Sequence, residues 1–317
     1  RRVDYASGLR QGLIQEYDAD APYLEQLAKL IDVKPIVDAG LRVVADSMWG
    51  VGQGWFQRLL GGGRTVVNEI HNQRNPLFPN MKRPEPIEEN LTDLLATIPA
   101  WGGDAGVATD GDADRVGFAN EKGAFVNQLQ VYALLSYYLL EVRGLRGPLV
   151  RTISTTVMAD KLAARYGVPV YATGVGFKYV APKMLETNAI MGGEESGGFA
   201  FGSHIPERDG VFSDLLLLEL MAVSGKSLGK LVADLVDKHN TILMANHGVV
   251  TWRHNNVEDA YFKMEILEAY CRTVLVASQL GKPVQTMTPA QLQDLLKIKQ
   301  NLGIPDPRFG LKECELC

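Results

Sequence analysis

Short apolar runs alternate with stretches of helical length along the first 240 residues, and this alternation constrains the fold more than any other feature. Predicted strands occupy residues 41–46, 65–70, 106–109, 116–119, 149–153, 168–172 and 189–192. Predicted helices occupy residues 1–30, 55–60, 88–95, 128–142, 157–166, 179–186 and 214–223. A chain that alternates in this way forms largely parallel sheets with helices on both faces. We therefore predict an α/β protein.

The rhythm of strands and helices occurs twice, which predicts two tandem α/β domains with mainly parallel sheets flanked by helices, followed by a mainly helical C-terminal segment. We place these parts at residues 1–120, 121–239 and 240–317. A length of 317 residues leaves room for two or three domains. The chain opens with Arg1 and carries no signal peptide, so we expect it to be a piece of a longer protein.

Composition excludes several classes of protein. Hydrophobic residues make up 46% and charged residues 22%, which is typical of a globular chain with a buried core. A net charge of −5 argues against a nucleic-acid surface, and no apolar run approaches the roughly 20 residues of a membrane span. Three cysteines are too few for a disulfide framework, so we predict a cytoplasmic location. Cys314 and Cys317 form a CxxC without a second pair, which we interpret as incidental.

Residues 110–115, Asp-Gly-Asp-Ala-Asp-Arg, lie between two predicted strands and are the strongest chemical signal in the chain. Three carboxylates at alternate positions of one tight loop repel each other unless a cation offsets their charge. Mg²⁺ binds hard carboxylate oxygens and leaves its other positions to water and phosphate. We therefore predict a Mg²⁺ site formed by Asp110, Asp112 and Asp114.

Two other interpretations of this loop remain open. The first is an acidic turn that is simply solvated. The second is an EF-hand loop, which also begins with DxDxD and ends in Glu at its twelfth position, where this chain has Glu121. However, the sixth position of an EF-hand loop needs Gly, and this chain has Arg115 there. The flanking segments also resemble strands and not helices, so we favour the magnesium site.

Three more loops carry polar groups. Residues 193–198, Gly-Glu-Glu-Ser-Gly-Gly, follow a strand, and their glycines let the backbone approach a ligand whose hydroxyls Glu and Ser can bind. Residues 173–178, Thr-Gly-Val-Gly-Phe-Lys, also follow a strand and end in a cation. Residues 204–210, His-Ile-Pro-Glu-Arg-Asp-Gly, form a polar turn that could supply Arg208 to a phosphate. Taken singly, each loop is also consistent with a plain turn.

Together these loops resemble those of the α-D-phosphohexomutases, the family of phosphoglucomutase and phosphomannomutase. Residues 110–115 resemble the family's metal loop, residues 193–198 its sugar-recognition loop, and residues 173–178 the loop before that. Their order and spacing fit as well, and the resemblance covers about residues 1–239. It implies the second and third of four domains, in a family that moves phosphate between C1 and C6 of a hexose.

The resemblance also implies roles for individual residues. Mg²⁺ held by the three aspartates would activate a phosphoserine of the family's first domain as an electrophile. Arg115 would support the phosphoryl group, and Glu194 and Ser196 would bind the 3- and 4-hydroxyls of the sugar. Lys178 would contact an anionic ligand or transfer a proton. The predicted substrate-binding residues are Thr173, Gly174, Glu194, Ser196 and Arg208, and the predicted catalytic residues are Arg115 and Lys178.

The sequence also departs from the family pattern. The donor loop, a Ser beside His-Asn-Pro, and the phosphate-binding loop of the fourth domain, Arg-x-Ser-Gly-Thr-Glu-Pro, occur nowhere in the 317 residues. We therefore expect little or no turnover by this chain alone. The Gly-Glu-Glu-Ser-Gly-Gly form of the sugar loop resembles members that act on glucose or mannose 1- and 6-phosphates more than the amino-sugar mutases.

From residue 241 the character of the sequence changes. A predicted strand at 241–250 contains Asn-His-Gly, a predicted helix follows at 257–280, and a capping box at 288–291 opens another helix to about residue 300. This segment resembles the C-terminal part of class II aldolase/adducin-type proteins, in which the corresponding histidine is one of three zinc ligands. One histidine cannot form a catalytic zinc site, so a structural role for His247 is favoured. Both a true fusion and an artefactual junction remain open.

Three functional interpretations follow from these features. The leading one is a partial, Mg²⁺-dependent phosphohexomutase that binds a hexose phosphate. The second is a metal-dependent class II sugar-phosphate aldolase, whose signature would be zinc binding. The third is a non-catalytic chain that binds Mg²⁺ or sugar phosphate, with a possible oligomer formed through apolar surface of its C-terminal helices.

Overall fold

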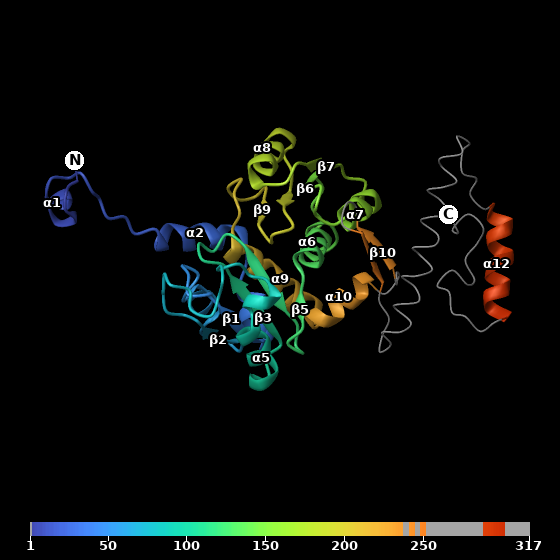
Figure 1. The fold of residues 1–317 in the computed structure, drawn as a ribbon, viewed down its shortest axis with the longest axis horizontal. Coiled ribbons are helices and arrows are strands. Elements are labelled where there is room, and N and C mark those ends of the chain that lie inside the picture. Colours follow the sequence, from blue (N-terminus) through green and yellow to red (C-terminus); the bar gives the residue numbers. More distant parts are fainter. Residues whose placement is uncertain (1, 237–240, 245–247, 252–287, 302–317) are drawn as a thin grey trace. The chain divides into compact units, whose positions relative to one another are not determined.

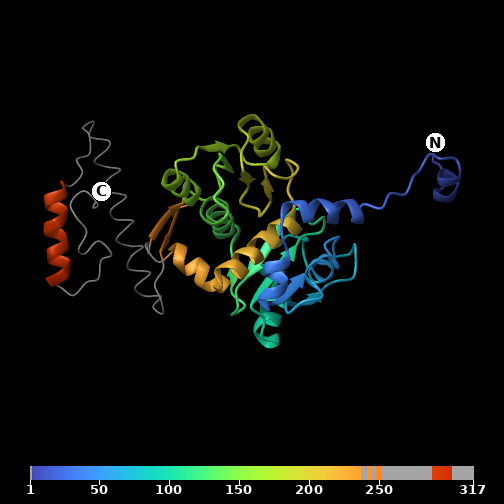
Figure 2. The same ribbon diagram turned by 180° about the vertical axis from the view of Figure 1, so that it is seen from behind.

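The computed structural model describes residues 2–236, 241–244, 248–251 and 288–301 (Figure 1). The chain divides into two compact units, residues 1–233 and 234–317. The first unit contains two separate sheets with flanking helices, and the second contains a two-stranded sheet and a helix (Figures 1 and 2). The predicted α/β class is therefore confirmed. Among the described residues, no helix combines the length and the apolar character needed to cross a membrane.

The first sheet has five strands in the order β2-β1-β3-β4-β5. Its strands are β1 (Arg42–Asp46), β2 (Val66–Ile70), β3 (Ala105–Thr109), β4 (Val116–Ala119) and β5 (Phe125–Val126). The pairs β1–β2 and β1–β3 are parallel, whereas β3–β4 and β4–β5 are antiparallel. Its helices are α3 (Lys34–Ala39), α4 (Trp55–Leu60), the short 3₁₀ helix η1 (Glu88–Asn90) and α5 (Thr92–Trp101). Leu94 and Ile98 of α5 pack into the same core as Val44 and Ala108 of the sheet, which fixes the ends of β1 and β3.

The second sheet has four strands in the order β7-β6-β8-β9, and only its last strand is antiparallel. Its strands are β6 (Leu149–Thr152), β7 (Val170–Thr173), β8 (Met191–Gly193) and β9 (Phe199–Phe201). Its helices are α6 (Gln128–Tyr137), the π-helical turn η2 (Tyr138–Val142), α7 (Met158–Tyr166) and α8 (Phe177–Thr187). Val180 and Met184 of α8 pack on Val150 and Ala200 of the sheet.

Helix α9 (Gly210–Ser224) packs against elements of both sheets. It contacts β3 and β4 of the first sheet and β9 of the second, and twelve of its fifteen residues are buried. A helix that is apolar on all sides is stable only inside a protein core, and α9 therefore holds the two sheets together. Helix α10 (Leu228–Val236) follows, and the backbone N–H of Gly229 donates to Glu121 on the β4–β5 turn at 3.1 Å.

Several helix boundaries differ from the prediction. The expected helix at 1–30 is two helices, α1 (Tyr5–Arg10) and α2 (Asp20–Leu30). Gly12, with φ of 70°, follows the end of α1, and Pro22 lies in the first turn of α2, where no intrahelical N–H bond is needed. Helix α5 begins later and extends further than the expected 88–95, and it ends where Gly102 adopts a left-handed conformation.

In the second unit, the expected strand at 241–250 is an antiparallel pair, β10 (Thr241–Met244) and β11 (Gly248–Thr251). The capping box is confirmed, because Thr288 N–H donates to Gln291 Oε1 at 2.9 Å and Gln291 N–H donates to Thr288 Oγ1 at 3.3 Å. Helix α12 (Pro289–Asn301) begins there. His247, the predicted helix at 257–280 and the CxxC pair lie outside the described residues.

Candidate functional site

The acidic loop, residues 110–115, turns the chain from β3 into the antiparallel β4. Asp110 organises the turn, because its Oδ1 accepts hydrogen bonds from the backbone N–H groups of Asp114 at 3.0 Å and Arg115 at 3.1 Å. Ala113 adopts a left-handed φ of 61°, which tightens the loop. As a result, ligand oxygens of Asp110, Asp112 and Asp114 all lie within 4.8 Å of one another.

The electrostatics of the acidic loop fit a divalent cation. Burial raises the pKa of Asp110, and burial together with the negative charge of Asp110 raises the pKa of Asp114 to about 6. Carboxylates that are held close enough to disfavour their own ionisation gain stability when a cation binds between them. Three hard oxygen donors on one loop match the ligand preference of Mg²⁺ or another hard divalent ion.

Arg115 lies across the acidic loop. Its Nε donates to Asp110 Oδ2 at 2.6 Å, and its guanidinium is 3.6 Å from Glu85 and 3.7 Å from Asp114. Glu85 belongs to the Pro-rich segment between β2 and α5, so carboxylates from two parts of the chain converge on this cation. The side chain is about one-quarter exposed, which leaves part of the guanidinium open to an anionic ligand.

The glycine-rich loop, residues 193–198, turns the chain from β8 into β9. Glu194 is only 7% exposed, and Ser196 Oγ is buried without a hydrogen-bond partner among the described residues. Glu195 faces the second sheet, where its Oε2 accepts from the hydroxyls of Thr152 at 2.7 Å and Ser154 at 2.6 Å. The carboxylate of Glu195 therefore anchors the loop, whereas Glu194 and Ser196 supply its polar groups.

Backbone hydrogen bonding joins the acidic loop to the glycine-rich loop. Val116 N–H donates to the Gly197 carbonyl at 3.1 Å, and Arg115 pairs with Gly198 in an isolated antiparallel bridge. The glycines permit this approach, since a Cβ at Gly197 would lie 2.7 Å from the Val116 carbonyl oxygen. A Cβ at Gly198 would lie 2.3 Å from a carbon of Arg208.

Arg208 connects the two loops through its side chain. Its guanidinium lies 2.7 Å from Asp114 Oδ2 and 3.1 Å from Glu194 Oε1, and it rests over the ring of Phe177 at 5.2 Å. One cation thus neutralises an acid of each loop. This contact brings one predicted metal ligand, Asp114, and the predicted sugar-binding Glu194 to a single guanidinium.

The remaining predicted residues lie at the end of β7 and the start of α8. Thr173 Oγ1 donates to the backbone carbonyl of Gly174 at 3.1 Å, and α8 begins three residues after Gly174, at Phe177. Lys178 Nζ lies 5.1 Å from the ring centroid of Tyr179. Within the described part of the chain, no hydrogen bond or ion pair joins Lys178 to Asp114 or to Glu194. Phe177, the neighbour of Lys178, is the residue of this loop that contacts the site.

Sequence reasoning missed several residues that build the site. Glu195 lies in the Gly-Glu-Glu-Ser-Gly-Gly motif. The hydrogen bond that its side chain accepts from Thr152 depends on how the second sheet is arranged, which the motif does not indicate. Asp209 could have been identified as a helix cap, because it precedes the apolar run of α9. Tyr23 gave no local signal, since its partner Asp209 is 186 positions away.

The loop after β1 forms another wall of the site. Met48 and Trp49 adopt left-handed φ values of 46° and 61°, a strained conformation that is uncommon for non-glycine residues. Val51 N–H donates to the Gly111 carbonyl at 3.2 Å, and a Cβ at Gly50 would lie 2.6 Å from that oxygen. The acidic loop is therefore held in place from the β1 side as well.

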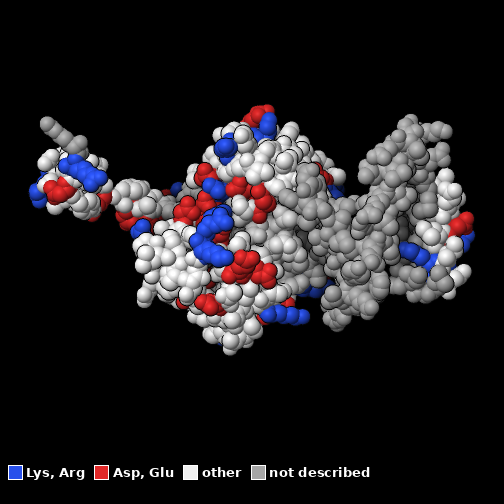
Figure 3. Space-filling model, viewed as in Figure 1, with Lys and Arg blue, Asp and Glu red and all other residues white. Residues whose placement is uncertain are grey.

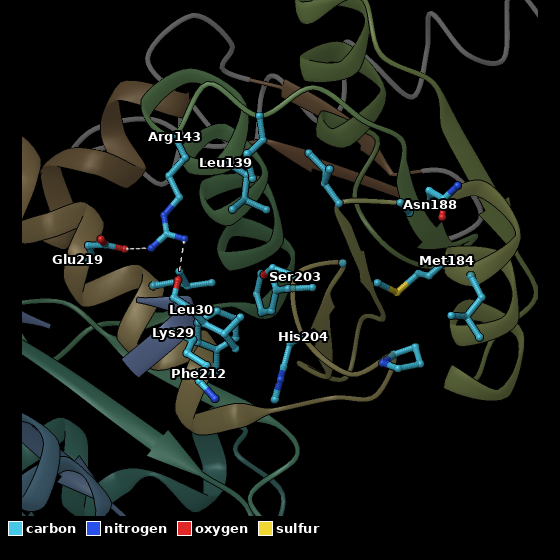
Figure 4. A pocket seen from close by; sticks show the side chains of 18 of the residues that line it. Lys29, Leu30, Leu139, Arg143, Met184, Asn188, Ser203, His204, Phe212 and Glu219 are labelled. Atoms are coloured by element: carbon cyan, nitrogen blue, oxygen red, sulfur yellow. Dashed lines mark hydrogen bonds and ion pairs between the residues drawn. The ribbon is translucent and has the colours of Figure 1, made fainter. Parts of the chain in front are cut away.

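A cavity of about 760 Å³ lies between α2, η2, α8 and α9, and no residue of the acidic loop or the glycine-rich loop lines it (Figure 4). Arg143 and Glu219 form an ion pair of 2.5 Å at its wall, and Arg143 also donates to the Leu30 carbonyl. His204 contributes to the lining.

On the face shown in Figure 3, basic and acidic side chains of the described residues are interleaved, and no extended basic patch is present on that part of the surface.

Two family models match the chain in consecutive segments. Residues 21–123 match the α/β/α domain II of phosphoglucomutase/phosphomannomutase, and residues 127–239 match domain III of the same family. Neither match extends into residues 240–317, and the expected resemblance of that segment to class II aldolases is not supported.

Curated relatives agree with these matches. A phosphoglucomutase/phosphomannomutase of Thermococcus kodakarensis is 36% identical over 71% of this chain and 49% of its own length. A phosphoglucosamine mutase of Exiguobacterium sibiricum is 29% identical over 72% of this chain and 50% of its own length. The chain thus spans about half the length of the curated relatives it matches.

Solved structures share the fold. A candidate phosphomannomutase of Thermus thermophilus has a TM-score of 0.65 and 38% identity, covering 69% of this chain and 50% of that one. A phosphoglucomutase/phosphomannomutase family protein of Burkholderia thailandensis has a TM-score of 0.61 and 25% identity, covering 72% and 48%. Through its residues 21–239, this chain belongs to the phosphoglucomutase/phosphomannomutase family, the α-D-phosphohexomutases.

Proposed function

We propose that this chain provides the metal-binding and sugar-binding domains of a phosphohexomutase, an isomerase that moves phosphate between C1 and C6 of a hexose. One observation carries the proposal: Arg208 lies within 3.1 Å of both Asp114 and Glu194, so the two loops border the same space. A metal-bound phosphoryl group and a bound sugar must lie next to each other in such a reaction.

We infer that Asp110, Asp112 and Asp114 hold Mg²⁺, whose chemistry when bound is to withdraw charge from a phosphoryl oxygen. The chain's own groups act around that position. Arg115, fixed by Asp110 and Glu85, presents its remaining N–H groups to phosphoryl oxygens. Arg208 would exchange its contact with Asp114 or Glu194 for a phosphate, or retain both contacts and orient Glu194.

The glycine-rich loop is our proposed sugar site. Glu194 is a nearly buried acceptor, and Ser196 Oγ lacks a partner among the described residues. Two adjacent ring hydroxyls would satisfy both groups at once. We further propose that Thr173 and Gly174, at the end of β7, and Lys178, in the first turn of α8, reach the bound ligand, where Lys178 would contact a phosphate or transfer a proton.

Glucose or mannose 1- and 6-phosphates are the substrates we favour, because of the Gly-Glu-Glu-Ser-Gly-Gly form of the sugar loop. Relatives of both kinds, phosphoglucomutase/phosphomannomutase and phosphoglucosamine mutase, match the chain. No donor-serine motif occurs in the 317 residues. We therefore propose that this chain binds the hexose phosphate but shows little or no turnover by itself.

Calorimetric titration with glucose 1,6-bisphosphate in the presence of Mg²⁺ tests this proposal. The expected result is one site in the wild type, at least tenfold weaker in Glu194→Gln and unchanged in Glu89→Gln, which alters an exposed acid elsewhere. Glucosamine 6-phosphate serves as the competing sugar. No binding of either sugar by the folded protein would contradict the proposal.

A coupled assay for glucose 6-phosphate formed from glucose 1-phosphate completes the test, with Asp112→Ala as its control. We expect a rate close to that of the control. If the wild type turns over glucose 1-phosphate and Asp112→Ala does not, the proposal that this chain is incomplete is wrong. The assignment to phosphohexomutase activity would then still hold.

A further inference from the structure

Three consecutive residues connect the acidic loop, the glycine-rich loop and α9. The Arg208 guanidinium bridges Asp114 and Glu194, and the Gly210 N–H donates to the Ala113 carbonyl at 2.9 Å. Asp209 lies between them, and its side chain forms no hydrogen bond with either loop within the described residues. Its position in the chain means that any movement of Asp209 is transmitted directly to Arg208.

The Asp209 carboxylate is held by donors from three parts of the structure. It accepts from the Tyr23 hydroxyl at 2.9 and 3.0 Å, from His204 Nε2 at 3.1 Å, and from the Phe212 backbone N–H at 2.9 Å. The residue is 9% exposed. A carboxylate with this many donors in a buried setting has one preferred orientation.

The donors are themselves fixed by packing. The Tyr23 ring meets Trp55 of α4 edge-on at 4.9 Å, and the His204 ring meets Phe212 at 5.7 Å. Tyr23 belongs to α2, within the segment that matches domain II, whereas His204 and Asp209 belong to the segment that matches domain III. The contact therefore joins the segments that match the two domains.

Charge in this cluster is concentrated on Asp209. Burial, followed by the negative charges of Asp209 and then Asp214, raises the pKa of Tyr23, so its hydroxyl remains a donor. Burial and the charge of Asp209 also raise the pKa of Asp214 well above its usual range. Asp214 is fully buried and its carboxyl has no hydrogen-bond partner among the described residues.

We propose that Asp209, held by Tyr23 and His204, is a positioning residue that fixes Arg208 between the acidic loop and the glycine-rich loop. Asp209 contacts no group proposed to bind metal or sugar, so it acts only through Arg208 and the start of α9. The effect of Asp209 on catalysis rests on the proposed function. The predicted effect of Asp209 on the orientation of Arg208 does not.

The test uses Tyr23→Phe, which removes one donor to Asp209 and retains the ring that packs on Trp55. The Nε–H resonance of Arg208 is assigned by its loss in Arg208→Gln and followed by nitrogen-15 NMR. We expect Tyr23→Phe and Asp209→Asn to shift or broaden this resonance, and Tyr17→Phe, which alters an exposed tyrosine, to leave it unchanged. This readout requires no sugar binding, so it separates the inference from the proposed function.

A double-mutant cycle on glucose 1,6-bisphosphate affinity gives the second readout. Tyr23→Phe is expected to weaken binding three- to tenfold in the wild type and by less than twofold in Arg208→Gln. Equal effects of Tyr23→Phe in both backgrounds, or an unchanged Arg208 resonance in Tyr23→Phe and Asp209→Asn, would overturn the proposal.

Discussion

Arg208 Nη2 lies 2.7 Å from Asp114 Oδ2, and this contact joins two segments that are almost one hundred residues apart in the sequence. The same guanidinium reaches Glu194 at 3.1 Å. A proposed metal ligand and a proposed sugar ligand therefore share one cation.

Replacing Arg208 is expected to change the two ligand affinities in opposite directions. At pH 8, Arg208→Gln should tighten Mg²⁺ binding about threefold to tenfold, because a positive charge next to Asp114 is removed. The same variant should weaken glucose 1,6-bisphosphate binding at least tenfold, because a phosphate contact is lost. Calorimetric titration measures both. A parallel weakening of both ligands would instead indicate general disruption of the site.

Gly210→Ala is expected to destabilise the fold. A Cβ at this position would lie 2.7 Å from the Ala113 carbonyl oxygen and 3.1 Å from that of Arg115, so the acidic loop must shift. We expect a loss of about 1–3 kcal/mol in the free energy of unfolding. Gly174→Ala is the matched control, since its Cβ would meet only the Tyr179 ring at an ordinary 3.5 Å. Equal urea midpoints for the two variants would refute the predicted clash.

Asp214→Asn should alter how stability depends on pH. The folded-state pKa of Asp214 is raised above the unfolded value of 3.8 by burial and by Asp209. Above the unfolded pKa the native state therefore binds more protons than the unfolded state, and stability falls as pH rises, by at most about 1.4 kcal/mol per pH unit for one group. The fall continues through the folded-state pKa.

The variant lacks this titration, so it should match the wild type near pH 3.5 and be more stable at neutral pH. Urea unfolding at several pH values measures the difference, with Glu89→Gln as an exposed control. A constant difference between Asp214→Asn and the wild type across this range would mean that Asp214 is not kept protonated by the fold.

Leu94→Ala tests the packing of α5 on the first sheet. Leu94 is fully buried in the cluster that contains Val44 and Ala108. Its truncation should lower the free energy of unfolding by about 2–5 kcal/mol, because apolar contacts are lost and a cavity remains. Leu77, which is 85% exposed, provides the comparison, and Leu77→Ala should cost less than about 0.5 kcal/mol. Similar losses for the two would contradict the assigned core.

Much of the fold could be predicted from local sequence. Strand periodicity identified β1 to within one residue and β4 at its observed bounds, and turn residues placed the acidic and glycine-rich loops at strand ends. The capping box at Thr288 needed only residues within one turn of a helix. Boundaries that depend on tertiary packing, such as the far end of α5, were predicted less well.

The site was harder to predict because its assembly depends on distant pairs. The bond from Val116 to Gly197 and the bonds from Tyr23 to Asp209 join residues that carry no local signal for one another. Sequence patterns identified the polar groups of each loop and Arg208, but not that the Arg208 side chain joins the two loops. Packing of α9 on both sheets determines that arrangement, and no short motif encodes it.

Isothermal titration of Mg²⁺ into the metal-free protein tests the central claim most directly. We predict one binding site in the wild type and in Glu89→Gln, and binding weakened at least tenfold in Asp112→Asn, whose exposed carboxylate is part of the acidic cluster. No saturable binding by the folded wild type, or equal affinity in Asp112→Asn, would contradict a metal site formed by Asp110, Asp112 and Asp114.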